Sequence, residues 1–156
     1  MAPTRTRYAA PGWGVGELWR EGGRIVWHEL PRTAEAAADD GDPLAARLRR
    51  YFAGDPVTFD DVEVELESPT PFRLALSEAL RSVPRGEVVT YGELAALAGR
   101  PGAARAAGTF CARNALPLFV PCHRVVAAGG IGPYGSLGVD YKRRLLALEG
   151  YDGAAL

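Results

Sequence analysis

The sequence predicts an α+β protein, a mixed α/β class in which a small sheet-containing α/β domain at residues 1–69 precedes a mainly helical domain at residues 70–156. Three observations support this division. Aromatic and β-branched residues on both sides of Glu21-Gly22 are typical of a β-hairpin. The segment Ser68-Pro69-Thr70-Pro71 interrupts regular structure, because proline lacks a backbone N–H and fixes its own backbone angle. Beyond this break, apolar residues recur at helical spacing.

The first domain contains the two arms of that hairpin, which are expected at Gly14–Arg20 and Gly23–Leu30. Leucine and aromatic residues then recur at helical spacing over Pro43–Phe52, which predicts a short helix ending near Gly54. In Val57–Glu65 polar and apolar residues alternate, and this pattern predicts a further half-buried strand. We therefore expect a small sheet with one helix.

The second domain is expected to open with a helix that ends before Pro84-Arg85-Gly86; its apolar face comprises Phe72, Leu76, Ala79, Leu80 and Val83. Thr90 can cap the next helix, and Glu93 three residues later completes a capping box. The buried face of that helix is expected to comprise Leu94, Leu97 and Ala98. A turn follows, Pro101 is expected to open the next helix, and the alanine-rich part of that helix is expected from Ala103 to about Ala112.

This helix-turn-helix spacing admits two interpretations. Two short helices joined by a glycine turn are often plain architecture, and a helix with so little side-chain bulk could pack tightly against a sheet. The same small residues would let the helix lie in a nucleic-acid groove, with Arg105 and Arg113 projecting from its surface. The pattern alone leaves both interpretations open.

Composition limits the class of protein. The chain is 47% apolar, enough for a packed core, and no apolar run approaches the roughly 20 residues that cross a bilayer. Residues 1–10 lack the apolar centre of a signal peptide, so a soluble, cytoplasmic protein is expected. The formal net charge of −1 gives no overall attraction to nucleic acid, so DNA binding would need a locally basic surface. In a reducing compartment Cys111 and Cys122 are expected to be free thiols.

Cys122, His123 and Arg124 stand in succession between two apolar stretches. A buried cysteine is normally an inert, small apolar residue. Here an imidazole can remove the thiol proton, and a nearby positive charge can stabilise the thiolate that attacks carbon. A carboxylate is needed to orient the imidazole, and Glu149 near the end of the last helix is the candidate. Arg124 is expected to brace the loop rather than touch substrate.

The run Pro121-Cys122-His123-Arg124-Val125 resembles the active-site signature of the O6-alkylguanine-DNA alkyltransferases, also called methylated-DNA–protein-cysteine methyltransferases. Further segments resemble this family in the same order, and with the signature they extend the resemblance over essentially all of residues 70–151: Pro84–Ala95, Ala103–Ala106, Asn114, Gly132–Gly135, Lys142–Leu146 and Glu149-Gly150. The resemblance implies an RNase H-like N-terminal domain and a winged helix-turn-helix DNA-binding and catalytic domain. Residues 1–69 resemble the family only in layout.

The resemblance also implies DNA repair by direct damage reversal. Cys122 would accept an alkyl group, methyl above all, from O6 of a guanine flipped out of double-stranded DNA. Arg105 would fill the vacated stack from the minor groove, and Tyr91 would push the rotated phosphate and assist protonation of the leaving guanine. Ala104 and Arg113 would lie against the DNA as well. O4-methylthymine is a second candidate substrate, and the stable thioether would limit each molecule, expected to be a monomer, to one turnover.

By the same resemblance, His123 would act on Cys122 through a water held with Glu149, and Asn114 would stabilise the turn that bears the cysteine. The alkylguanine pocket would be lined by Tyr134, Val125, Gly132, Gly135, Pro117 and Cys111. Ala115, Cys111 and Gly135–Gly138 depart from the common pattern, so acceptance of larger alkyl groups stays open. No cofactor and no metal are expected, because residues 1–69 contain His28 but no cysteine to join it in a zinc site.

Two rival classes remain to be weighed. A non-catalytic alkyl-lesion-binding protein would share the fold but lack the reactive cysteine, and Cys122 argues against it. A Cys-His hydrolase or redox protein would need an oxyanion arrangement or a CxxC spacing, and neither is visible in the sequence. Methyl transfer from DNA without hydrolysis separates both rivals from the alkyltransferase.

Overall fold

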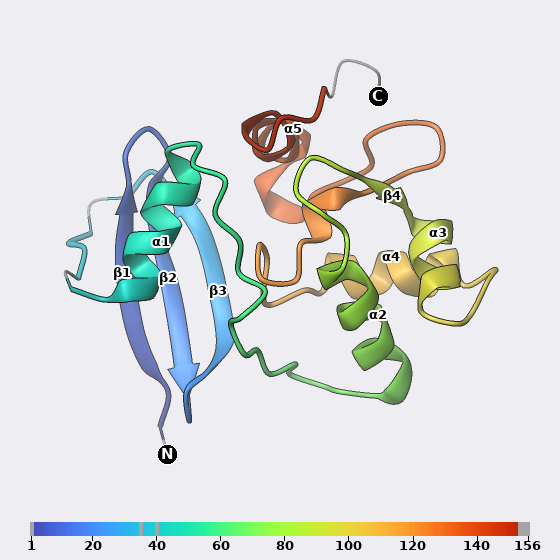
Figure 1. Cartoon of the computed structure of the whole chain (residues 1–156), viewed down its shortest axis with the longest axis horizontal. Coiled ribbons are helices and arrows are strands. Elements are labelled where there is room, and N and C mark those ends of the chain that lie inside the picture. Colours follow the sequence, from blue (N-terminus) through green and yellow to red (C-terminus); the bar gives the residue numbers. More distant parts are fainter. Residues whose placement is uncertain (1, 35, 40, 153–156) are drawn as a thin grey trace. The chain divides into compact units, whose positions relative to one another are not determined.

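A computed structural model describes residues 2–34, 36–39 and 41–152 of the chain (Figure 1). The contacts divide it into two compact units, which are described separately. Unit 1 comprises Met1–Glu67 together with Ala115–Phe119, and unit 2 comprises Ser68–Asn114 together with Val120–Leu156. No helix among the described residues is long and apolar enough to span a bilayer.

Unit 1 is a three-stranded antiparallel sheet with one helix on its face (Figure 1). The strands are β1 (Thr4–Ala10), β2 (Gly14–Glu21) and β3 (Arg24–Arg32), in that order across the sheet, and the helix is α1 (Pro43–Phe52). Asp42 caps α1, and the helix buries Leu48, Tyr51 and Phe52. The predicted hairpin and helix are confirmed.

Strand β1 has no counterpart in the elements predicted from sequence. It pairs along its whole length with β2, and Tyr8 lies opposite Gly16. The ring of Tyr8 passes directly over this glycine, because a Cβ built there would lie 2.4 Å from the ring. The strand therefore depends on a partner in β2, and its own alternation, with only Thr6, Tyr8 and Ala10 buried, is too short to predict it.

The strand predicted at Val57–Glu65 is wrong. The alternation of half-buried and exposed side chains is present, but among the described residues the segment pairs only through an isolated parallel bridge between Ile25 and Val64. Farther along β3, the His28 N–H donates to the carbonyl of Ala115 at 2.9 Å. Two separate segments thus share the edge of β3, and neither continues as a regular strand.

Unit 2 is mainly helical, as predicted, and it also contains one short parallel pair of strands (Figure 1). In chain order its elements are α2 (Pro71–Arg81), β4 (Val89–Thr90), α3 (Tyr91–Leu97), α4 (Ala104–Ala112), the 3-10 turn η1 (Cys122–Arg124), β5 (Val125–Val126), the 3-10 turn η2 (Gly135–Leu137) and α5 (Val139–Leu148). The predicted fold class is confirmed: a small antiparallel sheet with one helix precedes a helical unit that contains the helix-turn-helix pair α3 and α4.

The capping box of α3 is also confirmed, since Thr90 accepts from the Glu93 N–H and Glu93 accepts from the Thr90 N–H. The predicted buried face is wrong in one position. Leu97 is 61% exposed, whereas Leu94 and Ala95 are fully buried. At 100° per residue Leu97 lies well to one side of the stripe that contains Leu94, Ala95 and Ala98, and the small Ala95 gave no sign of burial. Helix α4 begins at Ala104, so Pro101 belongs to the turn and does not open the helix.

Candidate active site

The cysteine lies on η1, immediately before β5. Strand β5 pairs in parallel with β4, and the register sets Val125 beside Val89 and Val126 beside Thr90. Since Tyr91 follows Thr90 directly, this ladder brings the start of α3 to the segment that bears Cys122. Cys122 is buried, and its Sγ lies 4.0 Å from the hydroxyl oxygen of Tyr134.

Burial raises the pKa of the Cys122 thiol, because a thiolate in an apolar environment loses its hydration. Hydrogen bonds from Asn114 and Tyr134 and the charge of Lys142 act in the opposite direction. Asn114 also braces the chain, because its Nδ2 donates to the carbonyl of Val120 at 2.8 Å. The resting group is therefore a thiol whose neighbours favour its ionised form.

His123 and Glu149, the candidate carboxylate of the sequence analysis, lie side by side. His123 Nε2 lies 3.0 Å from Glu149 Oε2, and both side chains are completely buried. Both ring nitrogens of His123 are buried, and neither makes a hydrogen bond of acceptable geometry among the described residues, so the approach of Nε2 to Glu149 is a close polar contact. Burial lowers the pKa of His123, and the negative charge of Glu149 opposes this shift. The imidazole is thus neutral at rest, with Nδ1 available as a base.

Arg124 binds Glu149 with both prongs of its guanidinium. Nε donates to Oε1 at 2.9 Å, Nη2 donates to Oε2 at 2.8 Å, and Nη1 donates to the carbonyl of Val83 at 2.7 Å. Burial opposes ionisation of Glu149, but the charges and hydrogen bonds of His123 and Arg124 hold its pKa well below the usual range. Arg124 braces the site through a carboxylate and a carbonyl, as predicted.

Lys142 on α5 is a residue of the site to which the sequence analysis assigned no role. Its Nζ is fully buried and donates to the carbonyls of Ile131 and Pro133, at 2.7 and 3.2 Å. Burial lowers the pKa of Lys142 to about 8. Because Lys142 is followed directly by the exposed Arg143 and Arg144, it looks like one more surface charge in the sequence, and no local pattern indicates its burial.

Tyr91 faces the same region. Burial, with smaller contributions from Cys111 and Cys122, raises the pKa of Tyr91 to about 12, so its hydroxyl keeps its proton at neutral pH. A Cβ built on Gly132, where φ is +76°, would lie 3.2 Å from the Tyr91 hydroxyl. Gly132 therefore lets the loop approach this tyrosine.

The other pocket residues expected from the resemblance do not all lie in the unit that contains Cys122. Val125 follows η1 in β5, and burial raises the pKa of Cys111, which interacts electrostatically with Cys122. Gly135 has a φ of +53°, and no atom lies within 4 Å of a Cβ built there, so its role is to allow the turn. Pro117 lies in the segment that packs in unit 1. Within the described ranges no group of three or more His, Cys, Asp or Glu residues is placed to hold a metal ion.

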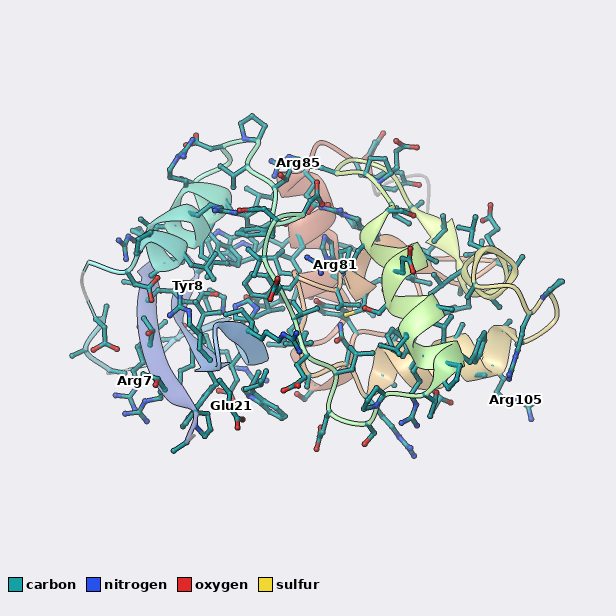
Figure 2. All side chains as sticks on the ribbon, turned by 60° about the horizontal axis from the view of Figure 1, so that its bottom comes forward. Arg7, Tyr8, Glu21, Arg81, Arg85 and Arg105 are labelled. Atoms are coloured by element: carbon teal, nitrogen blue, oxygen red, sulfur yellow. The ribbon has the colours of Figure 1, made fainter. Side chains whose placement is uncertain are left out.

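Helix α4 presents a thin, exposed surface. Of the residues of α4, all of which the structure describes, only Ala107 is buried. Arg105 and Arg113 are exposed. Figure 2 shows Arg105 extending away from the helix. A Cβ on Gly108 would lie 3.9 Å from the ring of Tyr91, so α4 passes close to the start of α3.

The charge of the chain is divided unequally between the units. Unit 2 contains ten Lys and Arg against six Asp and Glu, a formal charge of +4. Unit 1 contains eight Arg against thirteen Asp and Glu, a formal charge of −5. The net charge of −1 therefore conceals a basic unit that includes Cys122, α3 and α4.

Comparisons with known proteins identify one family. The family profile described as "6-O-methylguanine DNA methyltransferase, DNA binding domain" matches residues 71–151. A protein of Methanopyrus kandleri named methylated-DNA–protein-cysteine methyltransferase is 48% identical over 107 residues, 69% of this chain and 79% of that protein. A protein of the same name from Metallosphaera sedula is 38% identical over 146 residues, 92% of this chain and 90% of its own.

Among solved structures, the OGT of Mycobacterium tuberculosis in complex with DNA superposes with a TM-score of 0.76 at 35% sequence identity. The match covers 94% of this chain and 92% of that one. The profile covers the segment that bears Cys122, and the relative from Metallosphaera sedula and the solved structure extend the similarity over most of the chain. The chain belongs to the 6-O-methylguanine DNA methyltransferase family.

Proposed function

We propose that this protein repairs double-stranded DNA by transferring the methyl group of O6-methylguanine to Sγ of its own Cys122. The observation that carries the proposal is the buried series Cys122, His123 and Glu149, in which a thiol precedes a neutral imidazole that is paired with a carboxylate. The relatives named methylated-DNA–protein-cysteine methyltransferases support the same chemistry.

The transfer is a displacement at carbon. The Cys122 sulfur forms a bond to the methyl carbon while the bond from that carbon to O6 breaks, and the electron pair passes to guanine. The thiol proton moves through a water to His123 Nδ1, and Glu149 stabilises the imidazolium. Tyr91, whose hydroxyl is protonated at neutral pH, donates a hydrogen bond to the leaving guanine.

Access to the methyl group requires that the damaged nucleotide leave the stack. We assign this step to α4, whose small residues let the helix approach the minor groove while Arg105 occupies the vacated position and Arg113 contacts the backbone. The positive charge of unit 2 supports DNA binding by this unit.

Tyr134 stacks on the flipped base, beside the backbone of Val125 and Gly132. Methyl is the proposed substrate group, and O4-methylthymine is a second substrate. Because a thioether is a poor leaving group, each molecule reacts once.

The test is incubation of the protein with a duplex that carries one radiolabelled O6-methylguanine, followed by denaturing electrophoresis and peptide mapping. Label on the Cys122 peptide, saturating at one per protein and absent from Cys122→Ala, is the expected result. A control variant, Cys111→Ala, should still carry its label on the Cys122 peptide. If the duplex is bound while the label stays on the DNA, the protein recognises lesions without repairing them.

A further inference from the structure

The segment Ala115–Phe119 packs in a different unit from the residues on either side of it. Its contacts place it in unit 1, whereas its flanks Asn114 and Val120 belong to unit 2. The hydrogen bond from Asn114 to the Val120 carbonyl joins the residues that flank this segment. Cys122 follows Val120 by two residues, so the chain enters the active-site turn directly from a segment that unit 1 holds.

His28 on β3 binds this segment at two points. Its backbone N–H donates to the carbonyl of Ala115 at 2.9 Å, and its Nδ1 lies 2.7 Å from the carbonyl oxygen of Pro117. Because a carbonyl oxygen only accepts, Nδ1 must carry the ring proton. Nε2 is then an acceptor, and the Tyr8 hydroxyl 2.7 Å away donates to it. Both ring nitrogens are satisfied in one neutral tautomer.

Packing reinforces these hydrogen bonds. The ring of Phe119 meets His28 edge-on at 5.0 Å and Phe59 at 5.2 Å between centroids. Leu116 and Leu118 are buried. Burial also lowers the pKa of His28 to about 4, so the ring stays neutral and the link stays intact throughout the physiological pH range.

The held segment is strained. Leu118 has a φ of +76°, and it is the one non-glycine residue in the described parts of the chain with a positive φ. A branched side chain rarely adopts this conformation unless its surroundings impose it, and such strain concentrates near functional sites. The contacts of His28 and Phe119, on either side of Leu118, supply that constraint.

We propose that His28 is a positioning residue for Cys122, because it holds Ala115–Phe119 in a strained path and thereby fixes where the Pro121-Cys122 turn begins. This inference rests on the proposed alkyl transfer. His28 touches none of the reacting atoms in this scheme. It acts through geometry, and a displacement of about 1 Å at a reacting atom can lower a rate on the order of 100-fold.

The test compares two substitutions of His28. His28→Phe keeps the ring volume and removes both hydrogen bonds, whereas His28→Asn places an amide N–H near Nδ1 and can still donate to the Pro117 carbonyl. Tyr8→Phe leaves the Pro117 bond and removes only the bond to Nε2. Glu29→Gln, an exposed neighbour on β3, is the matched control.

Three quantities are measured on folded protein: the first-order rate of methyl transfer at saturating DNA, the affinity for DNA, and amide hydrogen exchange at Val120–Arg124. We expect His28→Phe to lower the transfer rate roughly ten- to hundredfold, to speed exchange, and to leave DNA affinity within about twofold. His28→Asn should recover the rate to within about threefold of wild type, Tyr8→Phe should fall between the two, and Glu29→Gln should match wild type.

A purely structural role would reduce the amount of active protein without changing the rate of the folded fraction. Equal rates in His28→Phe and wild type, or equal losses in His28→Asn and His28→Phe, would overturn the proposal. Should His28→Phe fail to fold, Tyr8→Phe decides: an unchanged rate and unchanged exchange refute the positioning role. If wild type transfers no methyl group, the proposed function fails, while the exchange contrast between the variants still decides whether His28 fixes the Cys122 turn.

Discussion

Glu149 contacts two side chains at once, His123 and Arg124, and this arrangement determines which nitrogen of His123 carries the ring proton. The bidentate bond from Arg124 keeps the carboxylate ionised. An ionised carboxylate 3.0 Å from His123 Nε2 directs the ring proton to that nitrogen. The same carboxylate stabilises the imidazolium that the proposed transfer creates, which links a structural ion pair to the chemistry.

Glu149→Gln should therefore slow methyl transfer. The amide is close to the carboxylate in shape but cannot neutralise a charged imidazole, and loss of such support in general base catalysis costs on the order of 100-fold. The measurement is the single-turnover rate on the labelled duplex. Glu78→Gln, exposed on α2, serves as the control. A rate within about threefold of wild type would show that His123 needs no carboxylate.

His28 should make folding stability depend on pH. Its pKa is about 4 in the folded protein against 6.5 in an unfolded chain, so the unfolded state binds more protons between these values. The free energy of unfolding therefore falls as pH falls through this range, by up to about 3 kcal/mol from this residue. Urea titrations across the range should show a smaller pH dependence for His28→Asn than for wild type. Equal slopes would contradict the assignment.

At the scale of elements, α3 depends on its capping box, because the helix has seven residues and few other means to satisfy its first N–H groups. Thr90→Ala should lower the free energy of unfolding by about 1 kcal/mol. Thr90→Ser keeps the hydroxyl and should stay close to wild type. Urea denaturation of both variants checks the prediction, and equal losses would implicate the methyl group rather than the cap.

The pairing of β1 with β2 depends on Gly16. A methyl group there would overlap the Tyr8 ring, so Gly16→Ala should destabilise the protein by roughly 1–3 kcal/mol, the usual cost of overpacking. Gly129→Ala is the matched control, because no atom lies within 4 Å of a Cβ built at that glycine. Thermal unfolding of the two variants makes the comparison. Similar melting temperatures would mean that Tyr8 can move aside.

The elements show which signals are readable from sequence. The hairpin around Glu21-Gly22 and the capping box at Thr90 are local, and both were predicted. Strand β1 and the edge shared by Val64 and Ala115 depend on partners distant in the chain, and no local pattern contains them. The same holds for the site: Glu149 was a candidate by residue type, but its meeting with His123 and the burial of Lys142 follow from tertiary packing.

For the whole molecule, the division of charge matters more than the net charge. A basic unit that neutralises phosphates releases counterions, so affinity for DNA should fall steeply with salt although the chain is slightly acidic. Arg105→Ala and Arg113→Ala should each reduce the slope of log affinity against log salt by about 1 if the residue contacts a phosphate. Arg24→Ala, on β3 in unit 1, should leave the slope unchanged.

Binding measured by fluorescence anisotropy at several salt concentrations provides these slopes. A slope near zero for wild type would mean that DNA binding is not electrostatic. An effect of Arg24→Ala as large as that of Arg105→Ala would mean that the basic character of unit 2 does not select the DNA-binding surface.

The burial of Cys122 has a consequence for the working life of the protein. A molecule that reacts once is lost to repair whenever an oxidant or a stray electrophile reaches its sulfur. Burial and a raised pKa keep that sulfur protonated and shielded between encounters with DNA, and thiols are far less reactive than thiolates. The shielding thus preserves repair capacity, because the sulfur does not react with oxidants or electrophiles in solution before it meets damaged DNA.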